Sequence, residues 1–399
     1  MQLKAKFNEK RAFLALRPSN YIAGRTFRHF GKAFYIPKLG YFINDPELTK
    51  TILRDTDHFS FNEAGGLGTL ISELWGDIPT LLSMEGEEHD RVKFALLANF
   101  KEESLTQVVG QELKELTDKL CADLNKGQEV DVARYIRICT SKVTSKLLGV
   151  SDTNEKELLK ISNLVTEAMG LVDLKYKTYS KANKLKGEKC VKELKVIAKK
   201  YYDNPKLSKN SLINQLKALG YSDEKTYGFI TMFLIAGTVT VSSSFPRLVA
   251  LLIDTGSFDL LVNKPELLES AIDEGLRYIT PGPILLHGVK ETASISGYKF
   301  KKGRRVIVLL YNILHDSRYT QNANIFDIER EQNPEVKGLW FGVGAHFCMG
   351  SVLAKLEIKT ILKSLIKLDG TLEIKKRSFR KVGIYPGYES LVISLKPSR

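Results

Sequence analysis

The chain has 399 residues, of which 43% are hydrophobic and 27% charged, with a formal net charge of +14. This composition is ordinary for a packed globular protein and excludes an intrinsically disordered chain. The four cysteines are widely scattered and too few to staple a chain of this length, which favours a reducing, cytoplasmic compartment. No run reaches the roughly 20 apolar residues needed to cross a bilayer, so no transmembrane segment is expected.

The positive charge alone admits nucleic acid, an anionic membrane or an acidic protein as partner. No zinc-finger spacing or RNA-recognition motif accompanies it, so we expect no nucleic acid. Residues 1–40 contain nine Lys or Arg and one acid, Glu9, which leaves an organelle-targeting segment as an alternative to a folded N-terminus.

Helix-period patterns dominate the chain, with apolar residues three and four apart at 107–124, 134–148, 155–171, 184–202 and 353–368. Short alternating or β-branched runs predict strands at 34–43, 295–300, 305–310, 371–374 and 391–395. The prediction is a mainly α fold with a minor β-sheet. We expect one domain over 1–399, with 1–32 as a loosely ordered extension.

Residues 227–236 are apolar nearly all round, which predicts a helix buried on every side. The helix then continues into Ala-Gly-Thr-Val-Thr at 236–240. A glycine and two hydroxyls there suit either a ligand close to the backbone or close helix packing. Pro246 is expected to kink or break the helix.

The most informative stretch is 341–350, which reads Phe-Gly-Val-Gly-Ala-His-Phe-Cys-Met-Gly. Its glycines permit a tight loop that places Cys348 at the entry to a helix. Backbone N–H groups at such an entry favour the thiolate, which is a good soft ligand for iron. A buried hydrophobic role for Cys348 is the alternative, and the surrounding glycines and histidine disfavour it.

This stretch resembles the cysteine loop of the cytochrome P-450 superfamily, whose pattern F-G-x-G-x-H-x-C-x-G it meets in full. The resemblance implies the family's helical fold and heme b as cofactor. It makes Cys348 the proximal iron ligand, His346 a propionate contact and Phe341 a neighbour of the thiolate, with Gly342 and Gly350 completing the cradle. Axial thiolate donates electron density that favours O–O cleavage.

Glu274 and Arg277 match the family's E-x-x-R helix, and the segment 326–330 resembles the region whose arginine, here Arg330, completes a structural ion network. The spacing of three places Glu274 and Arg277 on one helical face. We interpret the three side chains as structural rather than catalytic.

The segment 88–93 resembles the family's helix in which a histidine and a basic residue four positions later bind a propionate. By this resemblance His89 and Lys93 take those roles, although Lys93 replaces the usual arginine and its fork-shaped donor set. His287 lies near the position of another propionate-binding arginine and is our candidate for that contact.

Ala236 to Thr240 aligns with the family's distal pattern A-G-x-D/E-T. Gly237 would let dioxygen approach, and Thr240 would hydrogen-bond dioxygen and its water, but Val239 replaces the acid that relays protons. We therefore expect a monooxygenase that hydroxylates or otherwise oxidises a small lipophilic substrate. The alternatives are a peroxide-using or otherwise atypical enzyme and a heme protein without turnover.

By family position, the substrate would meet a largely apolar set of side chains, as expected for a small-molecule site: Met232, Phe233, Ile235, Ile284, Leu285, Ile384 and Tyr385. Soluble bacterial members receive electrons from a separate ferredoxin-type or flavodoxin-type partner. The stretch 175–209 holds twelve lysines and three acids, so an acidic carrier protein or an anionic membrane is a candidate partner, against a plain solvated helix face.

Overall fold

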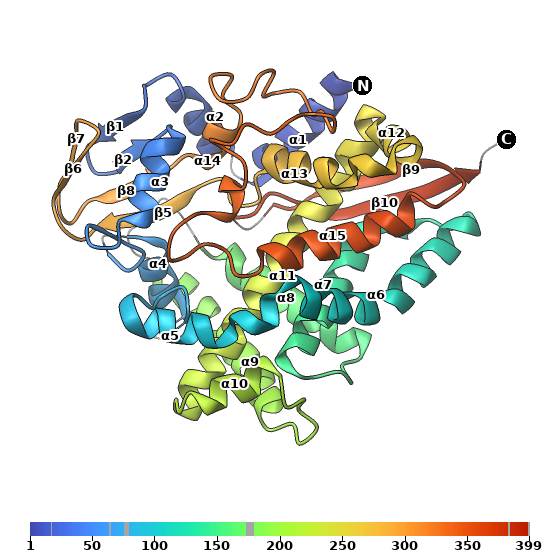
Figure 1. The fold of residues 1–399 in the computed structure, drawn as a ribbon, viewed down its shortest axis with the longest axis horizontal. Coiled ribbons are helices and arrows are strands. Elements are labelled where there is room, and N and C mark those ends of the chain that lie inside the picture. The colour runs from blue at the N-terminus through green and yellow to red at the C-terminus, as the bar shows by residue number, and fades with distance from the viewer. Residues whose placement is uncertain (17, 64, 76–79, 173–178, 382–383, 398–399) are drawn as a thin grey trace.

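The computed structural model describes the chain except for residues 17, 64, 76–79, 173–178, 382–383 and 398–399. Helices make up most of it (Figure 1): α1 (Gln2–Leu16), α2 (Pro18–Phe27), α3 (Pro46–Arg54), α4 (Leu67–Trp75), α5 (Gly86–Leu96), α6 (Glu102–Asn125), α7 (Val132–Leu148), α8 (Glu155–Gly170), α9 (Lys181–Tyr202), α10 (Leu212–Ala218), α11 (Asp223–Thr255), α12 (Ser257–Asn263), α13 (Leu268–Ile279), α14 (Leu310–Leu314) and α15 (Ser351–Leu365). The mainly α prediction is confirmed, and the five periodic segments lie in α6, α7, α8, α9 and α15.

The strands form three small sheets. A five-stranded sheet has the order β1-β2-β8-β5-β3, a three-stranded sheet the order β4-β10-β9, and β6 pairs with β7. Their bounds are β1 (Ala33–Ile36), β2 (Gly40–Ile43), β3 (Phe59–Ser60), β4 (Val130–Asp131), β5 (Leu285–Val289), β6 (Ala293–Ile295), β7 (Tyr298–Phe300), β8 (Arg305–Val308), β9 (Gly370–Phe379) and β10 (Tyr388–Pro397). The five predicted strand regions are present. Two of them, 34–43 and 295–300, are hairpins rather than single strands.

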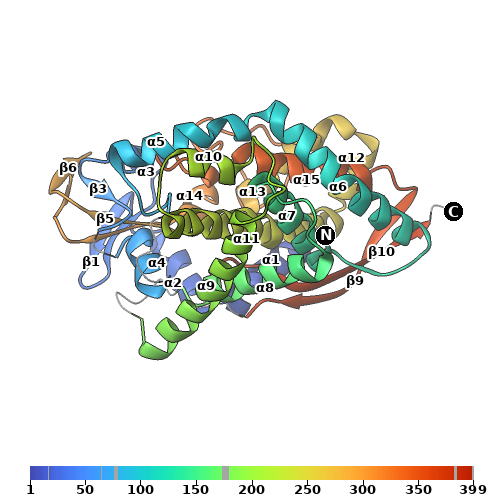
Figure 2. The same ribbon diagram turned by 90° about the horizontal axis from the view of Figure 1, so that it is seen from below.

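Helix α11 crosses the middle of the molecule in both views (Figures 1 and 2) and contacts α7, α8, α9, α1 and α13. The Ser222 side chain caps its N-terminus and Gly256, at φ 74°, ends it. It is long and apolar enough to span a membrane, yet 78% of its most apolar window is buried by the rest of the protein. The burial predicted for 227–236 is therefore confirmed for most of this helix.

The expected break at Pro246 does not occur, because α11 continues to Thr255. Proline removes a backbone donor and crowds the preceding turn. In that turn the hydroxyls of Ser243 and Ser244 both donate to the Thr240 carbonyl, at 2.8 and 2.7 Å. These bonds go to the carbonyl of Thr240 rather than to that of Ser242, the acceptor that Pro246 leaves without a backbone donor.

The N-terminal residues form helices rather than a loose extension. Ala5, Ala12 and Phe13 of α1 are buried, and α1 packs against α11. The buried Glu9 carboxylate forms an ion pair with Arg247 of α11. Burial of apolar side chains and of this ion pair explains why the segment is ordered despite its high positive charge.

Candidate functional site

The cysteine loop connects a short 3₁₀ turn (Leu339–Phe341) to α15. The Cys348 amide donates to the Phe341 carbonyl at 3.0 Å, which closes the loop. Gly342 and Gly344 have φ angles of 72° and 78°, a region that favours glycine. The loop therefore depends on these two glycines to present Cys348 at the start of α15.

The Cys348 thiol is accessible, while Cys139 and Cys190 are buried. Desolvation nevertheless raises the pKa of Cys348, and a hydrogen bond from the Gly350 amide and the nearby Lys93 ammonium act in the opposite direction. A thiol that is both accessible and desolvated lies in a recess rather than on a convex surface. The Gly350 amide is one of the donors expected to favour a thiolate.

One face of α11 is uncovered although the rest of the helix is buried. Between Thr226 and Leu252, the residues that are not buried are Phe233, Ala236, Gly237 and Thr240. Their spacing of three and four places them on one side of the helix. Ala236 is exposed in the middle of the protein's central helix, so this face of α11 is open where the rest of the helix is packed.

Gly237 packs tightly against the neighbouring helix α7. A side-chain carbon at Gly237 would come within 2.5 Å of the Thr144 hydroxyl oxygen. This contact supports the close-packing interpretation of the glycine. Thr144, whose buried hydroxyl has no hydrogen-bond partner among the described residues, was not among the predicted site residues.

The position of the missing acid faces the core. Val239 is 2% exposed, whereas its neighbour Thr240 is half-buried on the open face. The Thr240 hydroxyl donates to the Ala236 carbonyl at 3.3 Å, a long bond that leaves it free to exchange partners. Thr240 is therefore the polar side chain that α11 offers to the open face.

The three histidines predicted to contact propionates form one cluster, in which the Phe61 ring packs against His287 and His346 and His89 packs against His346. The Phe61 ring centroid lies 4.2 Å from that of His287 and 4.4 Å from that of His346, and His346 lies 4.7 Å from His89. Phe61 belongs to no motif, so its place in this cluster could not be predicted from sequence patterns.

The polar atoms of this cluster suit an anionic ligand. Burial lowers the pKa of His287 to about 4 and that of His346 to about 3, so both rings are neutral near pH 7 and carry one N–H donor each. His287 Nδ1 is buried without a partner in the described part of the chain. The Lys93 ammonium donates to the Ala345 carbonyl, and the Phe347 carbonyl lies 3.5 Å away.

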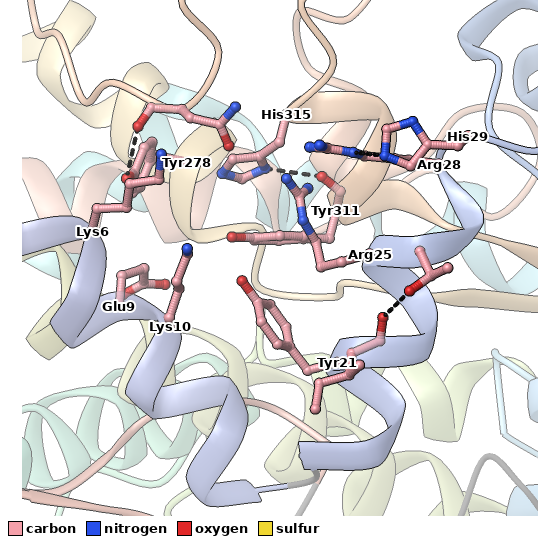
Figure 3. A pocket seen from close by; sticks show the side chains of 13 residues that line it. Lys6, Glu9, Lys10, Tyr21, Arg25, Arg28, His29, Tyr278, Tyr311 and His315 are labelled. Atoms are coloured by element: carbon pink, nitrogen blue, oxygen red, sulfur yellow. Dashed lines mark hydrogen bonds between the residues drawn. The ribbon is translucent and has the colours of Figure 1, made fainter. Parts of the chain in front are cut away.

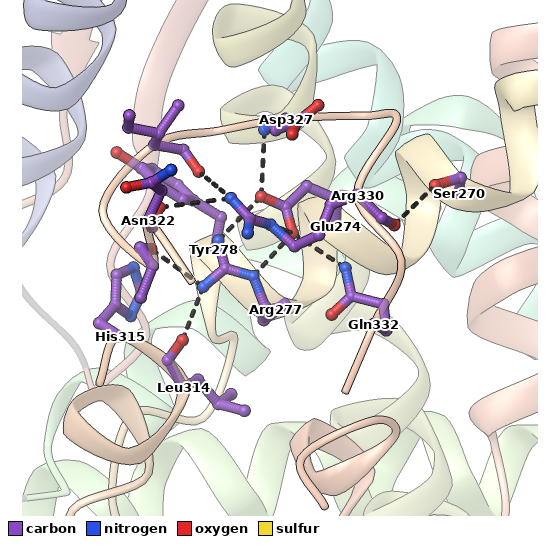
Figure 4. Close-up of polar contacts among 12 residues, drawn as sticks. Ser270, Glu274, Arg277, Tyr278, Leu314, His315, Asn322, Asp327, Arg330 and Gln332 are labelled. Carbon is purple, nitrogen blue, oxygen red and sulfur yellow. Dashed lines mark hydrogen bonds and ion pairs between the residues drawn. The ribbon is translucent and has the colours of Figure 1, made fainter. Parts of the chain in front are cut away.

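The charged residues of α13 form a separate, fully buried network (Figure 4). Arg277 donates to both carboxylate oxygens of Glu274, at 2.6 and 2.8 Å, and both side chains are 0% exposed. Arg330 Nε lies 3.3 Å from Glu274 Oε2, and Gln332 donates to the same oxygen at 2.9 Å. Gln332 was not predicted. The network ties α13 to the segment before the cysteine loop.

The predicted substrate contacts divide into two groups by burial. Phe233, Ile284, Leu285, Ile384 and Tyr385 are partly exposed. Tyr385 is close enough to Cys348 for that thiol to contribute, after burial, to raising the Tyr385 pKa to about 12.

Ile235 is only 2% exposed and Met232 9%, and Ile235 belongs to the core. Consecutive helical residues point about 100° apart, so Ile235 cannot share the open face with Ala236. Burial thus separates Ile235 from the open face, and its contact with a substrate stays a prediction.

These residues fit a heme. The Cys348 sulfur, a soft ligand once deprotonated, lies in a recess, and α11 presents an uncovered face that includes the small residue Ala236. Neutral histidines and a lysine supply donors for carboxylates. Among the described residues no group of three His, Cys, Asp or Glu could hold a bare metal ion. The cysteine, the histidines and the lysine together suit a porphyrin iron held through one cysteine.

Comparison with known proteins points to the same class of protein. The family model described as cytochrome P450 matches residues 261–368. The chain is 26% identical to the cytochrome P450 YjiB of Bacillus subtilis, over 80% of this chain and 79% of that protein. These similarities support the cytochrome P450 superfamily, bacterial type, as the family of this chain; its members are heme-containing monooxygenases that hold the iron through a cysteine thiolate.

Solved structures show the same fold. P450BioI in complex with an acyl carrier protein ligated to hexadec-9Z-enoic acid aligns with a TM-score of 0.79 at 20% identity, covering 96% of this chain and 99% of that one. CYP109E1 from Bacillus megaterium, in complex with testosterone, aligns with a TM-score of 0.79 at 21% identity and the same coverage.

Proposed function

We propose that this protein oxidises, and most simply hydroxylates, a small lipophilic substrate in the cytoplasm, using dioxygen and electrons from a separate ferredoxin-type or flavodoxin-type donor. The carrying observation is the uncovered face of α11, where Phe233, Ala236 and Thr240 stay accessible in the middle of an otherwise buried helix. In this proposal Cys348 ligates the heme iron. Phe341, Gly342 and Gly350 shape its loop, while His89, Lys93, His287 and His346 hold the propionates.

Bound heme supplies the activation of dioxygen and the oxidation of the substrate, and the protein supplies orientation and protons. Phe233 and Ala236 give this face of α11 an apolar surface that excludes water. Thr240 holds a water or a substrate hydroxyl in reach of the reacting atoms. Because Val239 is buried and carries no acid, protons reach Thr240 through water or through a polar group of the substrate itself.

This role of Thr240 predicts how tightly electron use is coupled to product. Substrates found by a spectral binding screen would be compared as pairs with and without a hydroxyl or carboxyl group. We expect tight coupling with the polar member and peroxide release with the other. Thr240→Ala should lower product per electron with both.

Val239→Asp should raise product per electron with the apolar member, because burial raises the pKa of the new carboxyl and leaves it a proton donor. Val239→Asn, which adds no acid, is the matched control. The measurement is the ratio of product to electrons consumed, with peroxide quantified. Equal ratios in all four proteins would refute proton delivery through this helix. Efficient turnover with peroxide in place of the redox partner would support the alternative of a peroxide-using enzyme. Val239 favours this alternative because it replaces the acid that would deliver protons.

The lysine-rich helix α9 supplies a candidate docking surface for an acidic partner. Lys195, Lys199 and Lys200 in its C-terminal half form ion pairs with acids. In its N-terminal half Lys181, Lys186, Lys189 and Lys192 are exposed and form no ion pair within the described residues. Residues 175–178 of the predicted stretch lie outside those that the structure describes.

The apolar side chain of Leu185 is 57% exposed among these free lysines. Figure 2 shows α9 running from the centre of the molecule to its edge. We propose that this half of α9 docks an acidic acyl carrier protein that presents a fatty substrate. A precedent is P450BioI, solved in complex with an acyl carrier protein ligated to hexadec-9Z-enoic acid. Complementary charge would accelerate this association, most strongly at low salt.

Reversing the charge of the four exposed lysines of α9 to glutamate should weaken capture of an acyl carrier protein at least tenfold and flatten its salt dependence. A matched variant reverses four exposed lysines elsewhere: Lys299, Lys301, Lys337 and Lys376. Both variants change net charge equally, so a steering effect of total charge would appear in both. Unchanged affinity in the α9 variant, measured at low salt, would contradict the docking proposal.

A further inference from the structure

A second cavity, of about 580 Å³, lies between the N-terminal helices and the core (Figure 3). Lys6 and Lys10 of α1 lie one helical turn apart on its rim. Tyr21 and Arg25 of α2 are four residues apart and so share the helical face toward the same cavity, and Arg28 follows in the turn after α2. Tyr278 and Tyr311 line the opposite wall. The size is typical of a small-molecule site.

The cavity has an excess of positive charge. Within the described part of the chain, Lys6, Lys10, Arg25 and Arg28 form no ion pair with a carboxylate. The one acid in the wall, Glu9, is already paired with Arg247. Burial lowers the pKa of Lys6, and the charges of Lys10, Arg25 and Arg28 add to this effect, so these cations lie close enough to repel one another. Such an arrangement is stabilised by a bound anion.

Two buried polar atoms in the wall lack partners in the described structure. Arg25 Nη1 is a donor. His315 Nδ1 lies 2.9 Å from the Tyr311 carbonyl, to which it donates, so Nε2 of the neutral ring is left as an unpaired acceptor. A ligand that pairs with both atoms must carry an oxygen that accepts from Arg25 Nη1 and an O–H group that donates to His315 Nε2. A monoprotonated phosphate group has this combination.

We propose that this cavity is a binding site for a phosphate group carried by a small organic molecule. Arg25 and Lys10 bind the phosphate oxygens, and His315 Nε2 accepts a hydrogen bond from the ligand's O–H. The volume exceeds that of a phosphate alone, and the tyrosine rings leave an organic portion in contact with aromatic surface. The free phosphate ester of a metabolite and a lipid headgroup share this chemistry.

The test uses the heme-loaded full-length protein. Binding of inorganic pyrophosphate and of a soluble aromatic phosphate monoester would be measured by isothermal titration calorimetry. Flotation would measure binding to phosphatidylcholine vesicles with and without phosphatidic acid. The variant is Lys10→Gln with Arg25→Gln. The control is Lys4→Gln with Arg11→Gln, which removes the same charge from the N-terminal helices outside the cavity wall.

We expect saturable binding that weakens at least tenfold in the cavity variant and less than twofold in the control. Binding of the soluble probes supports a metabolite, and binding of phosphatidic acid vesicles alone, with the same dependence on Lys10 and Arg25, supports a lipid headgroup. The proposal would be overturned if neither the soluble probes nor the phosphatidic acid vesicles bound. It would also be overturned if the cavity variant and the control variant lost affinity equally. The carbon monoxide spectrum of the reduced variant checks that the heme pocket is intact.

Discussion

The buried carboxyl of Glu357 in α15 destabilises the folded protein when it is ionised. Its spacing of four from Leu353 and Ile361 places it on the stripe of α15 that faces the core, and it is 1% exposed. Neither oxygen has a hydrogen-bond partner among the described residues. Burial raises the Glu357 pKa to about 8, so the folded protein holds this proton more tightly than the unfolded chain does.

This shift predicts a pH-dependent stability. The contribution of protonated Glu357 is fully present below its unfolded pKa and is lost as the pH rises through about 8. Glu357→Gln should therefore raise the free energy of unfolding at pH 9 by on the order of 2 kcal/mol and have little effect at pH 5. Denaturant titration at both pH values checks this, with the exposed Glu103→Gln as control. An equal effect at both pH values would contradict the assignment.

At the scale of elements, the network on α13 joins the core to the segment that leads into the cysteine loop. Glu274→Gln leaves Arg277 as an uncompensated buried charge, which typically costs about 3–5 kcal/mol. Heme retention should fall with stability. Asp118→Asn breaks the exposed Lys114–Asp118 pair and should leave the free energy of unfolding nearly unchanged. Denaturant titration and heme content per chain are the measurements. Full stability and heme content in Glu274→Gln, with loss of turnover alone, would make Glu274 catalytic.

How far the sequence predicted these elements depends on the kind of signal. Periodic helices such as α7 and α9 were predictable because their apolar stripes repeat over several turns. Strand β5 was missed because Leu-Leu-His-Gly-Val does not alternate, yet pairing with β8 makes it a strand. The apolar composition of α11 indicated burial but not which face stays open, so Ile235 was grouped with Phe233. Phe61 could not be predicted because its role arises from contacts between distant segments.

At the scale of the whole molecule, one long helix links the three regions discussed above. The middle of α11 carries the open face at Ala236, its C-terminal half holds the buried pair with Glu9 beside the N-terminal cavity, and α9 packs against it. The motif residues were predictable as a set because the family pattern is specific. Their grouping in space required the fold, since α5, β5 and the cysteine loop are far apart in sequence.

The central claim is that Cys348 ligates the heme iron, and its most direct test is the absorption spectrum of the reduced protein under carbon monoxide. The wild type should show the strongly red-shifted Soret band of thiolate ligation. Cys121→Ala, which removes a half-buried cysteine far from the loop in sequence, should keep it, and Cys348→Ala should lose it. A red-shifted band that persists in Cys348→Ala, or that is absent from heme-loaded wild type, would contradict the claim.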